Sequence, residues 1–396
     1  MLEATLRERA RGLLTAASGR SEVPAFMVMD VMAAAARIEA AGGHVIHMEV
    51  GQPAASAPKA AIAAARAALD SMRIDYTAAL GTPGLRERIA RHYRESYGFA
   101  VDSSRIVVTT GSSAAFILAF MAMFEPGDRV AVTVPGYPPY RHILTALGCE
   151  PVLIETSSET RHALTGEALL AAHRKAPLKG VLIASPANPT GTMMSREALS
   201  GLMAAAESAG IRFISDEIYH GLDYAFPAVT AAELSSDALV INSFSKYFCM
   251  TGWRVGWMVV PEPLVRPIER LQQNLSISVP TLSQIAAEAA FEGKHEMEEV
   301  KRAYLENRRI LIEGLPRAGL TKFLPADGAF YLYADVSDFT SDSLTFAGEM
   351  LEKAHVAATP GVDFDPIHGR QFIRFSYARS AQEMREAVDR IAHWLK

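Results

Sequence analysis

The chain has 396 residues, of which 49% are apolar and 21% are charged, and its formal net charge is −5 at pH 7. One hydrophobic core rarely serves a chain of this length, so we expect two domains. The mildly acidic charge gives no electrostatic footprint for nucleic acid or for an anionic membrane, and we expect neither as a partner.

Strands and helices are predicted to alternate through the middle of the chain. Residues 1–14 alternate charge with leucine and are not a secretory signal, and Val28–Ala41 follows a helical pattern. The longest apolar run, Ala114–Phe124, is too short to span a bilayer and predicts a buried helix. Helical patterns such as Arg196–Ala209 separate short β-branched runs. The expected strands are Ile106–Thr110, Val130–Val134, Val152–Ile154, Val181–Ala184, Ile211–Ser215, Leu239–Asn242 and Val255–Val260.

The pattern changes after Pro261, where helices dominate and strands become few. The alternation before this point predicts an α/β domain with a mostly parallel, seven-stranded sheet covered by helices. The remainder predicts a smaller α+β domain, which the N-terminal segment joins. We place the large domain at 45–283 and the small domain at 1–44 and 284–396. The elements expected after Pro261 are helices over Pro263–Leu315, strands near Gly328–Ala334 and Gln371–Ser376, and a final helix, Ala381–Leu395.

Four loops that follow predicted strands carry polar residues suited to a phosphorylated aromatic aldehyde. In parallel sheets, ligands bind beyond the carboxyl ends of the strands, so these loops meet there. The first loop, Gly111-Ser112-Ser113, leads into the apolar helix that we expect to start near Ala114. Its backbone N–H groups and the positive end of the helix dipole suit an anion. The alternative is that Ser112 or Ser113 only caps the helix.

The second and third loops offer side chains for a polar aromatic ring. Asn188, in the sequence NPTG, has an amide that can donate to a phenolate oxygen, although these residue types also build simple turns. Asp216 ends an apolar strand, and its carboxylate can keep a ring nitrogen protonated. Tyr219 lies three residues later, on the same face if a helical turn follows. The alternative for this pair is a helix cap and a packing tyrosine.

The fourth loop holds a lysine and, eight residues later, an arginine. Lys246 follows the strand that ends at Asn242, and its amine can form a Schiff base with an aldehyde. Ser243, Ser245 and the forked guanidinium of Arg254 can receive a phosphate. A solvated lysine and a structural arginine are the alternative, which the order of the four loops disfavours.

Longer motifs carry a resemblance to a known family. The run SFSKYFCMTGWRVGW, with ANPTG, SDEIY and YTAALGTPGLRERIARHY upstream, closely resembles the class I/II aminotransferases of pyridoxal-phosphate (PLP) fold type I. The match extends from about Val28 to the C-terminus. The resemblance implies PLP as the cofactor, Lys246 as the lysine that holds it, and a large sheet domain with a smaller α+β domain.

The resemblance also implies roles for residues with no strong local signal. Tyr137 corresponds to the aromatic ring that stacks on the pyridine of the cofactor. Arg374 corresponds to the arginine that clamps the substrate carboxylate, for which a bidentate guanidinium is better suited than lysine. Gly51 corresponds to a residue of the loop that closes over the substrate. Asn188 is also assigned to substrate binding. Tyr76 resembles the tyrosine that a partner subunit donates to the cofactor phosphate, which implies a homodimer with shared active sites.

These assignments predict a ping-pong transamination between an L-amino acid and a 2-oxo acid. Lys246 serves as Schiff-base lysine and as the general base that moves the Cα proton. Asp216 keeps the ring nitrogen protonated, and the cofactor acts as the electron sink. No second arginine has a local motif that marks it as a binder of a side-chain carboxylate, so specificity for dicarboxylates is unsupported.

Three other functions compete with transamination. A C–S β-lyase, or another PLP reaction on this fold, would also use Lys246 and Asp216; the TGWR run and Arg374 favour amino transfer. A PLP-sensing transcription regulator needs a DNA-binding domain, for which the chain has neither room nor charge. A dinucleotide-dependent dehydrogenase needs a GxGxxG motif after a strand, which is absent.

Metal chemistry and a disulfide scaffold are not expected. The two cysteines, Cys149 and Cys249, lie far apart in the sequence and lack metal-ligand spacing. The eleven histidines contain no HExxH motif or cluster. Two free thiols suit a reducing compartment, so we expect a cytoplasmic protein.

Overall fold

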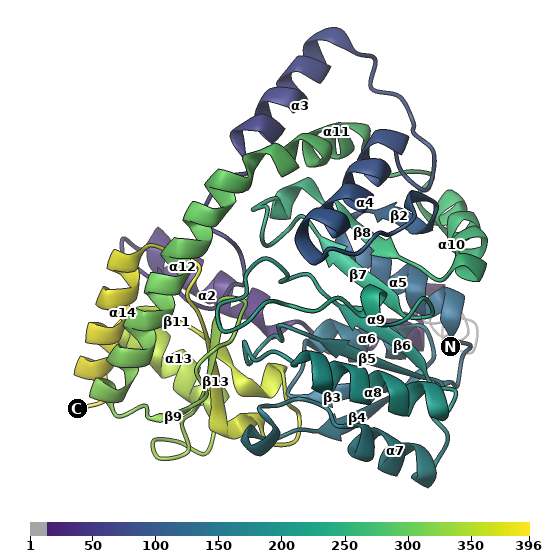
Figure 1. The fold of residues 1–396 in the computed structure, drawn as a ribbon. Helices are drawn as coiled ribbons and strands as arrows, with labels where there is room; N and C mark the ends of the chain where they lie inside the picture. The colour runs from purple at the N-terminus through teal and green to yellow at the C-terminus, as the bar shows by residue number, and fades with distance from the viewer. Residues whose placement is uncertain (1–13) are drawn as a thin grey trace, which may run out of the picture.

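A computed structural model describes residues 14–396, and its centre is a seven-stranded sheet (Figure 1). The strands are β2 (Ile106–Thr109), β3 (Arg129–Val134), β4 (Glu150–Glu155), β5 (Gly180–Ala184), β6 (Arg212–Asp216), β7 (Leu239–Ser243) and β8 (Gly256–Val259). They lie in the order β2-β8-β7-β6-β5-β3-β4. Within this sheet, β8 runs antiparallel to both neighbours and the other pairs are parallel. The predicted mostly parallel sheet is therefore confirmed.

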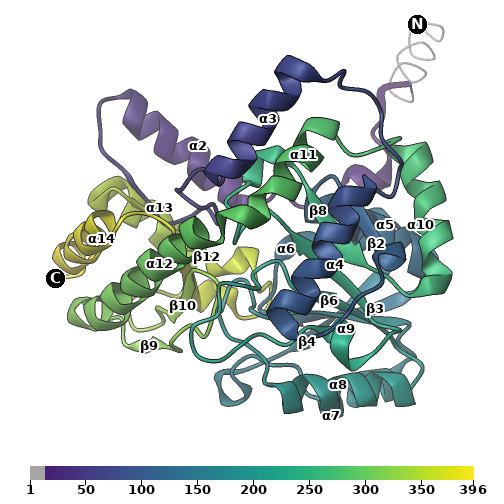
Figure 2. The same ribbon diagram turned by 45° about the horizontal axis from the view of Figure 1, so that its top comes forward.

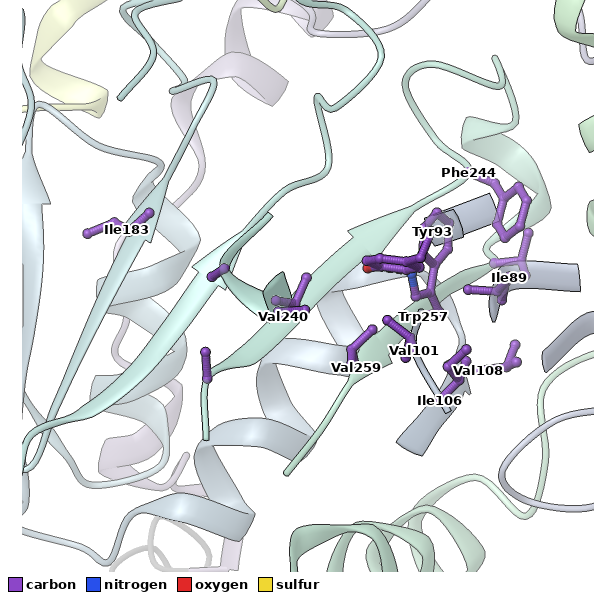
Figure 3. Packing of buried hydrophobic residues seen from close by; sticks show 14 of the residues in the cluster. Ile89, Tyr93, Val101, Ile106, Val108, Ile183, Val240, Phe244, Trp257 and Val259 are labelled. Atoms are coloured by element: carbon purple, nitrogen blue, oxygen red, sulfur yellow. Dashed lines mark hydrogen bonds between the residues drawn. The ribbon is translucent and has the colours of Figure 1, made fainter. Parts of the chain in front are cut away.

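Helices cover both faces of this sheet because its strands are apolar on both faces. Neighbouring residues of a strand point to opposite sides, so Ile106 and Val108 enter one core and Val107 enters the other. The first core also takes Trp257 and Tyr93, as Figure 3 shows. The helices of that face are α3 (Lys59–Ser71), α4 (Pro83–Tyr97), α7 (Gly166–Lys175), α8 (Arg196–Ser208), α9 (Ala231–Leu234) and α11 (Thr281–Ala290). The other face carries α5 (Gly111–Met123), α6 (Pro138–Ala146) and α10 (Glu262–Leu275).

A second, smaller sheet has its own core. Its strands are β9 (Lys322–Phe323), β10 (Tyr331–Asp335), β12 (Thr359–Pro360) and β13 (Phe372–Ser376), all antiparallel, in the order β12-β13-β10-β9. The helices α12 (Lys294–Gly314), α13 (Ser343–Ala354) and α14 (Ala381–Trp394) pack against it. Figures 1 and 2 show these helices on one side of the molecule, away from the large sheet.

The N-terminal part of the chain joins this smaller unit. Strand β1 (Ile46–His47) pairs with β11 (Val356–Ala357), and α2 (Met27–Ala40) packs on α13 through Ala35 and Leu351. Two residues pack on the other side of the predicted domain bounds. Ile46, predicted for the large domain, lies in the core of the small sheet, and Ala286, predicted for the small domain, lies in a core of the large sheet. The division at 45 and 284 stays a prediction. Residues 1–13, which include nearly all of the stretch considered as a secretory signal, lie outside the described residues.

One predicted boundary is wrong by three residues. Helix α5 begins at Gly111 and not near Ala114, so Ser112 and Ser113 form its first turn. The cause is the backbone of Gly111, whose φ of +70° turns the chain out of β2 and directly into the helix. Within residues 14–396, we find no helix with the length and apolarity needed to cross a bilayer.

We predict that Leu311→Ala lowers the free energy of unfolding by about 2–5 kcal/mol, because Leu311 is fully buried on α12 and its loss leaves a cavity. The control is Leu305→Ala on the same helix, where the side chain is 46% exposed and the change should stay within about 0.5 kcal/mol. Urea unfolding followed by circular dichroism measures both. Equal losses in the two variants would contradict the packing described for α12.

Candidate active site

Most of the predicted site residues gather around one cavity beyond the carboxyl ends of the parallel strands. The cavity has a volume of about 230 Å³. Loops after β2, β3, β5, β6 and β7 reach it from the large sheet, and β10 and β13 reach it from the small one. The predicted residues that line it are Gly51, Ser112, Ser113, Tyr137, Asn188, Tyr219, Ser245, Lys246, Arg254 and Arg374.

Three predicted residues do not line the cavity. Asp216 lies beneath it and accepts a hydrogen bond from Tyr140, which does line it. The Oγ of Ser243 lies 2.6 Å from the Oγ of Ser245, so Ser243 contacts the cavity only through Ser245. The side chain of Tyr76 is 80% exposed and takes no part in the cavity of its own chain.

One end of the cavity is built for an anion. Helix α5 presents its N-terminus there, and the helix N-cap is Thr110, so Ser112 and Ser113 are not caps. A Cβ on Gly111 would overlap the guanidinium of Arg254, so glycine makes room for this cation. Arg254 has a φ of +50°, a left-handed conformation that is uncommon for arginine and is found at functional sites. Its Nη1 donates to the carbonyl of Thr251 at 3.0 Å.

Lys246 lies in the loop after β7 and projects into the middle of the cavity. Its Nζ donates to the carbonyl oxygen of Gly51 at 2.6 Å. Burial lowers the pKa of Lys246 to about 8, and the positive charge of Arg374 acts in the same direction. A substantial fraction of this amine is therefore neutral near physiological pH, which makes it a nucleophile and a base.

Asp216 ends β6 and is the buried carboxylate of the site. Its Oδ1 accepts from the backbone N–H of Ile218 at 3.1 Å and so stabilises the turn after β6; no helix begins there, so Asp216 is not the helix cap considered as the alternative. Burial raises its pKa to about 6, against the effect of the hydrogen bond from Tyr140. Tyr140 was not predicted; it lies three residues after Tyr137, which caps α6, and this spacing was a signal that the two side chains lie close together.

Arg374 enters from β13 and is buried among polar and aromatic groups. It donates to Asn188 Oδ1 at 2.9 Å, to Thr359 Oγ1 at 3.1 Å and to the carbonyl of Glu49. Its guanidinium carbon lies 4.5 Å from the ring centroid of Tyr331. The buried Nε has no hydrogen-bond partner among the described residues, so the side chain retains capacity for a further acceptor.

Tyr331 connects the two sheets at the cavity. Its hydroxyl lies 2.9 Å from that of Tyr219, and a Cβ on Gly51 would overlap it, so glycine at 51 permits the close approach. Tyr331 was not predicted because it comes from β10 of the small sheet and no local motif marks it. Most of the remaining wall is apolar and was also missed; beside the polar Gln52 and Thr251, its members are Phe26, Val28, Met29, Val50 and Ile218.

Comparisons with known proteins identify the family. The model of the family "Aminotransferase class I and II" matches residues 43–391. A valine–pyruvate aminotransferase of Mycobacterium tuberculosis is 47% identical over 380 residues, which cover 95% of this chain and 97% of that protein.

Solved structures show the same fold. A crystal structure of an aminotransferase from Mycobacterium tuberculosis matches with a TM-score of 0.93 at 47% identity, over 96% of this chain and 99% of that one. The aspartate aminotransferase of Thermus thermophilus with maleate matches with a TM-score of 0.89 at 30% identity, over 96% and 99%. The chain therefore belongs to the class I and II aminotransferases, which are PLP-dependent enzymes, and it catalyses transamination.

Proposed function

We propose that this aminotransferase takes its amino group from an aliphatic L-amino acid such as valine and passes it to a small 2-oxo acid such as pyruvate, in a ping-pong reaction. One observation carries the proposal: among the described residues, the cavity is lined by three cations, Lys246, Arg254 and Arg374, and each has a task. None of these cations of the chain itself is left for a side-chain carboxylate. The relative that is 47% identical is a valine–pyruvate aminotransferase, which agrees with this choice.

The residues present fit PLP. We assign the phosphate to Arg254, the first turn of α5 and the hydroxyl groups nearby, because Gly111 leaves space beside the guanidinium. Asp216 would hold the ring nitrogen, and the hydrogen bond from Tyr140 keeps its carboxylate in place. Once bound, PLP supplies an electron sink for the charge that develops on the substrate carbon. The other residues assigned to the cofactor are Ser112, Ser113, Tyr137, Asn188, Tyr219, Ser243 and Ser245.

Arg374 is assigned to the substrate carboxylate. Hydrogen bonds to Asn188 and Thr359 orient its guanidinium group, which lies over the face of the Tyr331 ring. Such support holds a guanidinium in the position that a bidentate carboxylate requires. The loop at Gly51 lies next to both Lys246 and Tyr331, which supports its assignment to substrate closure.

Lys246 is assigned the proton transfer. The carbonyl of Gly51 accepts from Nζ and so directs the amine toward the space beside Arg374. There, Nζ would take the proton from the substrate Cα and carry it to C4′ of the bound cofactor. A pKa lowered to about 8 suits a group that must both accept and release a proton near neutral pH.

The apolar wall supports an aliphatic substrate side chain. Val28 and Met29 come from α2, and Phe26 precedes that helix and packs edge-on against Tyr137 at 5.9 Å between ring centroids. Ile218 adds apolar surface from the large sheet. These groups have no hydrogen-bonding capacity in their side chains, so a charged substrate side chain would lose its hydration there without compensation.

We also propose a homodimer in which Tyr76 completes the partner's cofactor site. The support is a group of exposed apolar side chains on two segments that meet where Thr281 donates to the carbonyl of Asp75. Exposed apolar patches of this kind mark interfaces. The members are Leu69, Met72, Ile74, Tyr76, Leu275 and Ile277, which are 43–80% exposed.

A cytoplasmic location is proposed as well. Both cysteines, Cys149 and Cys249, are free and buried. Burial raises the pKa of each thiol, which keeps them protonated and unreactive.

Donor specificity tests the proposed substrate. We expect kcat/KM for L-valine to exceed that for L-aspartate by at least about tenfold with pyruvate as acceptor, because the aspartate side chain would bury an unpaired carboxylate. L-Asparagine, which has the shape of aspartate without its charge, separates the effect of charge from that of polarity. A preference for L-aspartate would contradict the assignment of the three cations.

Mixed dimers test Lys246 and Tyr76 together. The Lys246→Ala homodimer should be inactive, and Tyr76→Ala should weaken cofactor binding and lower activity. A dimer with one chain of each kind should regain activity, because one of its sites combines the intact Lys246 with the intact Tyr76 of the other chain. Each variant mixed with itself is the control. If mixing restores no activity, the site is not shared in this way.

The pKa of Lys246 is a third test, made on the cofactor-free protein. Its amine should react with an acylating reagent with a midpoint near pH 8, as followed by mass spectrometry of the peptide. Arg374→Gln removes a neighbouring positive charge, which makes protonation easier and should move the midpoint upward. Arg370→Gln changes an exposed arginine outside the cavity and should leave it unchanged. If the midpoint for Lys246 were the same in Arg374→Gln as in the unchanged protein, the two cations would not interact.

A further inference from the structure

A second cavity, of about 270 Å³, lies beside the active-site loop, and of its lining residues only Ser243 has a role assigned above. It opens between α4, the start of α12 and the segment 220–228, and Asn242 and Ser243 of β7 contribute to its wall. Tyr247 and Phe248, which directly follow Lys246, also line it. It is at least as large as the active-site cavity.

Helix α12 presents alternating charges to this cavity. Lys294, Glu298 and Lys301 are spaced four and three residues apart, so they share one face of the helix, and all three line the cavity. Lys294 has no ion-pair or hydrogen-bond partner within residues 14–396. Lys301 lies 3.5 Å from Asp223, an ion pair without a hydrogen bond. The Oε1 of Glu298 accepts from the hydroxyl of Tyr247 at 2.6 Å.

The opposite wall adds aromatic surface and no free charge. Arg88 of α4 is paired with Glu95 at 3.2 Å and stacks on the ring of Phe291 at 4.2 Å. Burial lowers the pKa of His92 and of His220 to about 4, so both are neutral at physiological pH. The other aromatic members of the wall are Tyr97, Phe248 and Trp257.

We propose that this cavity is a second binding site, for a free α-amino acid with an apolar side chain. Lys294 and Lys301 receive the carboxylate, and Glu298, which lies between them along α12, receives the ammonium group. The apolar side chain rests on the aromatic wall. A plain carboxylate would be repelled by Glu298, and a plain cation would be repelled by the two lysines. The alternation of charge therefore selects a zwitterion.

Occupation of this site acts on the active-site loop through Tyr247. The ammonium group competes with the Tyr247 hydroxyl for Glu298, and Tyr247 is bonded directly to Lys246. The ring of Tyr247 packs against Gly221, where a Cβ would lie 2.6 Å from it, so this ring has little room to move without shifting the loop. Tyr247 thus contacts the second cavity and is joined through one peptide bond to the catalytic lysine.

Binding of L-leucine to the holoenzyme tests the proposal. The bond between Lys246 and the cofactor is first reduced with borohydride, so that no amino transfer consumes the probe. Equilibrium dialysis with radiolabelled L-leucine should show saturable binding that persists in Arg374→Gln, a change confined to the active site. Glu298→Gln and Lys294→Gln should each raise its Kd by about tenfold or more, because each removes a charge-assisted hydrogen bond. Glutamine at 298 still accepts from Tyr247, so the fold is preserved.

Matched controls come from the same helix. Glu299 and Arg302 are 57% and 67% exposed and do not line the cavity, so Glu299→Gln and Arg302→Gln should leave the Kd unchanged. Loss of binding in Arg374→Gln would place the leucine in the active site and overturn the proposal. Binding that is insensitive to Lys294 and Glu298, or no binding up to the solubility of the amino acid, would overturn it as well.

Discussion

Three positive side chains line one cavity, from the exposed Arg254 to the buried Arg374, and the rest of the site depends on this constraint. Lys246, Arg254 and Arg374 line it, and Asp216 is the carboxylate beneath it. Like charges are costly in a protein interior unless anions or hydrogen bonds compensate them. Backbone carbonyls meet part of this need at each cation, and the lowered pKa of Lys246 relieves another part. A ligand pair that carries a phosphate and a carboxylate, as PLP and an amino acid do, supplies the remainder.

The fold brings these charges together by joining two sheets at one edge. The carboxyl ends of the parallel strands supply Asp216, Lys246 and the N-terminus of α5, and β13 of the small sheet supplies Arg374. The segment that contains Gly51 contacts both halves, since its carbonyl accepts from Lys246 and its Cα lies against Tyr331. A relative shift of the two sheets would therefore change the distance between the catalytic lysine and the arginine that we assign to the substrate.

The segment from Ser243 to Phe248 separates two cavities of similar size. Ser245 and Lys246 line the active site, while Ser243, Tyr247 and Phe248 line the second cavity. The two cavities share no lining residue, but their ligands would contact residues that are neighbours along this segment. This arrangement gives the proposed amino-acid site a direct physical route to Lys246, without a long path through the core.

The sequence alone determined the sheet, the cofactor and most of the cavity. Strand periodicity and the order of the four loops are local signals, and parallel strands bring their carboxyl ends to one edge, so Ser112, Asn188, Asp216 and Lys246 could be grouped from residue types and spacing. Only the tertiary structure decided which side chains complete the site. Tyr331 and the apolar residues of α2 come from distant parts of the chain and carry no local motif, because their function arises from packing. The start of α5 at Gly111 likewise depended on a backbone angle that residue types alone do not specify.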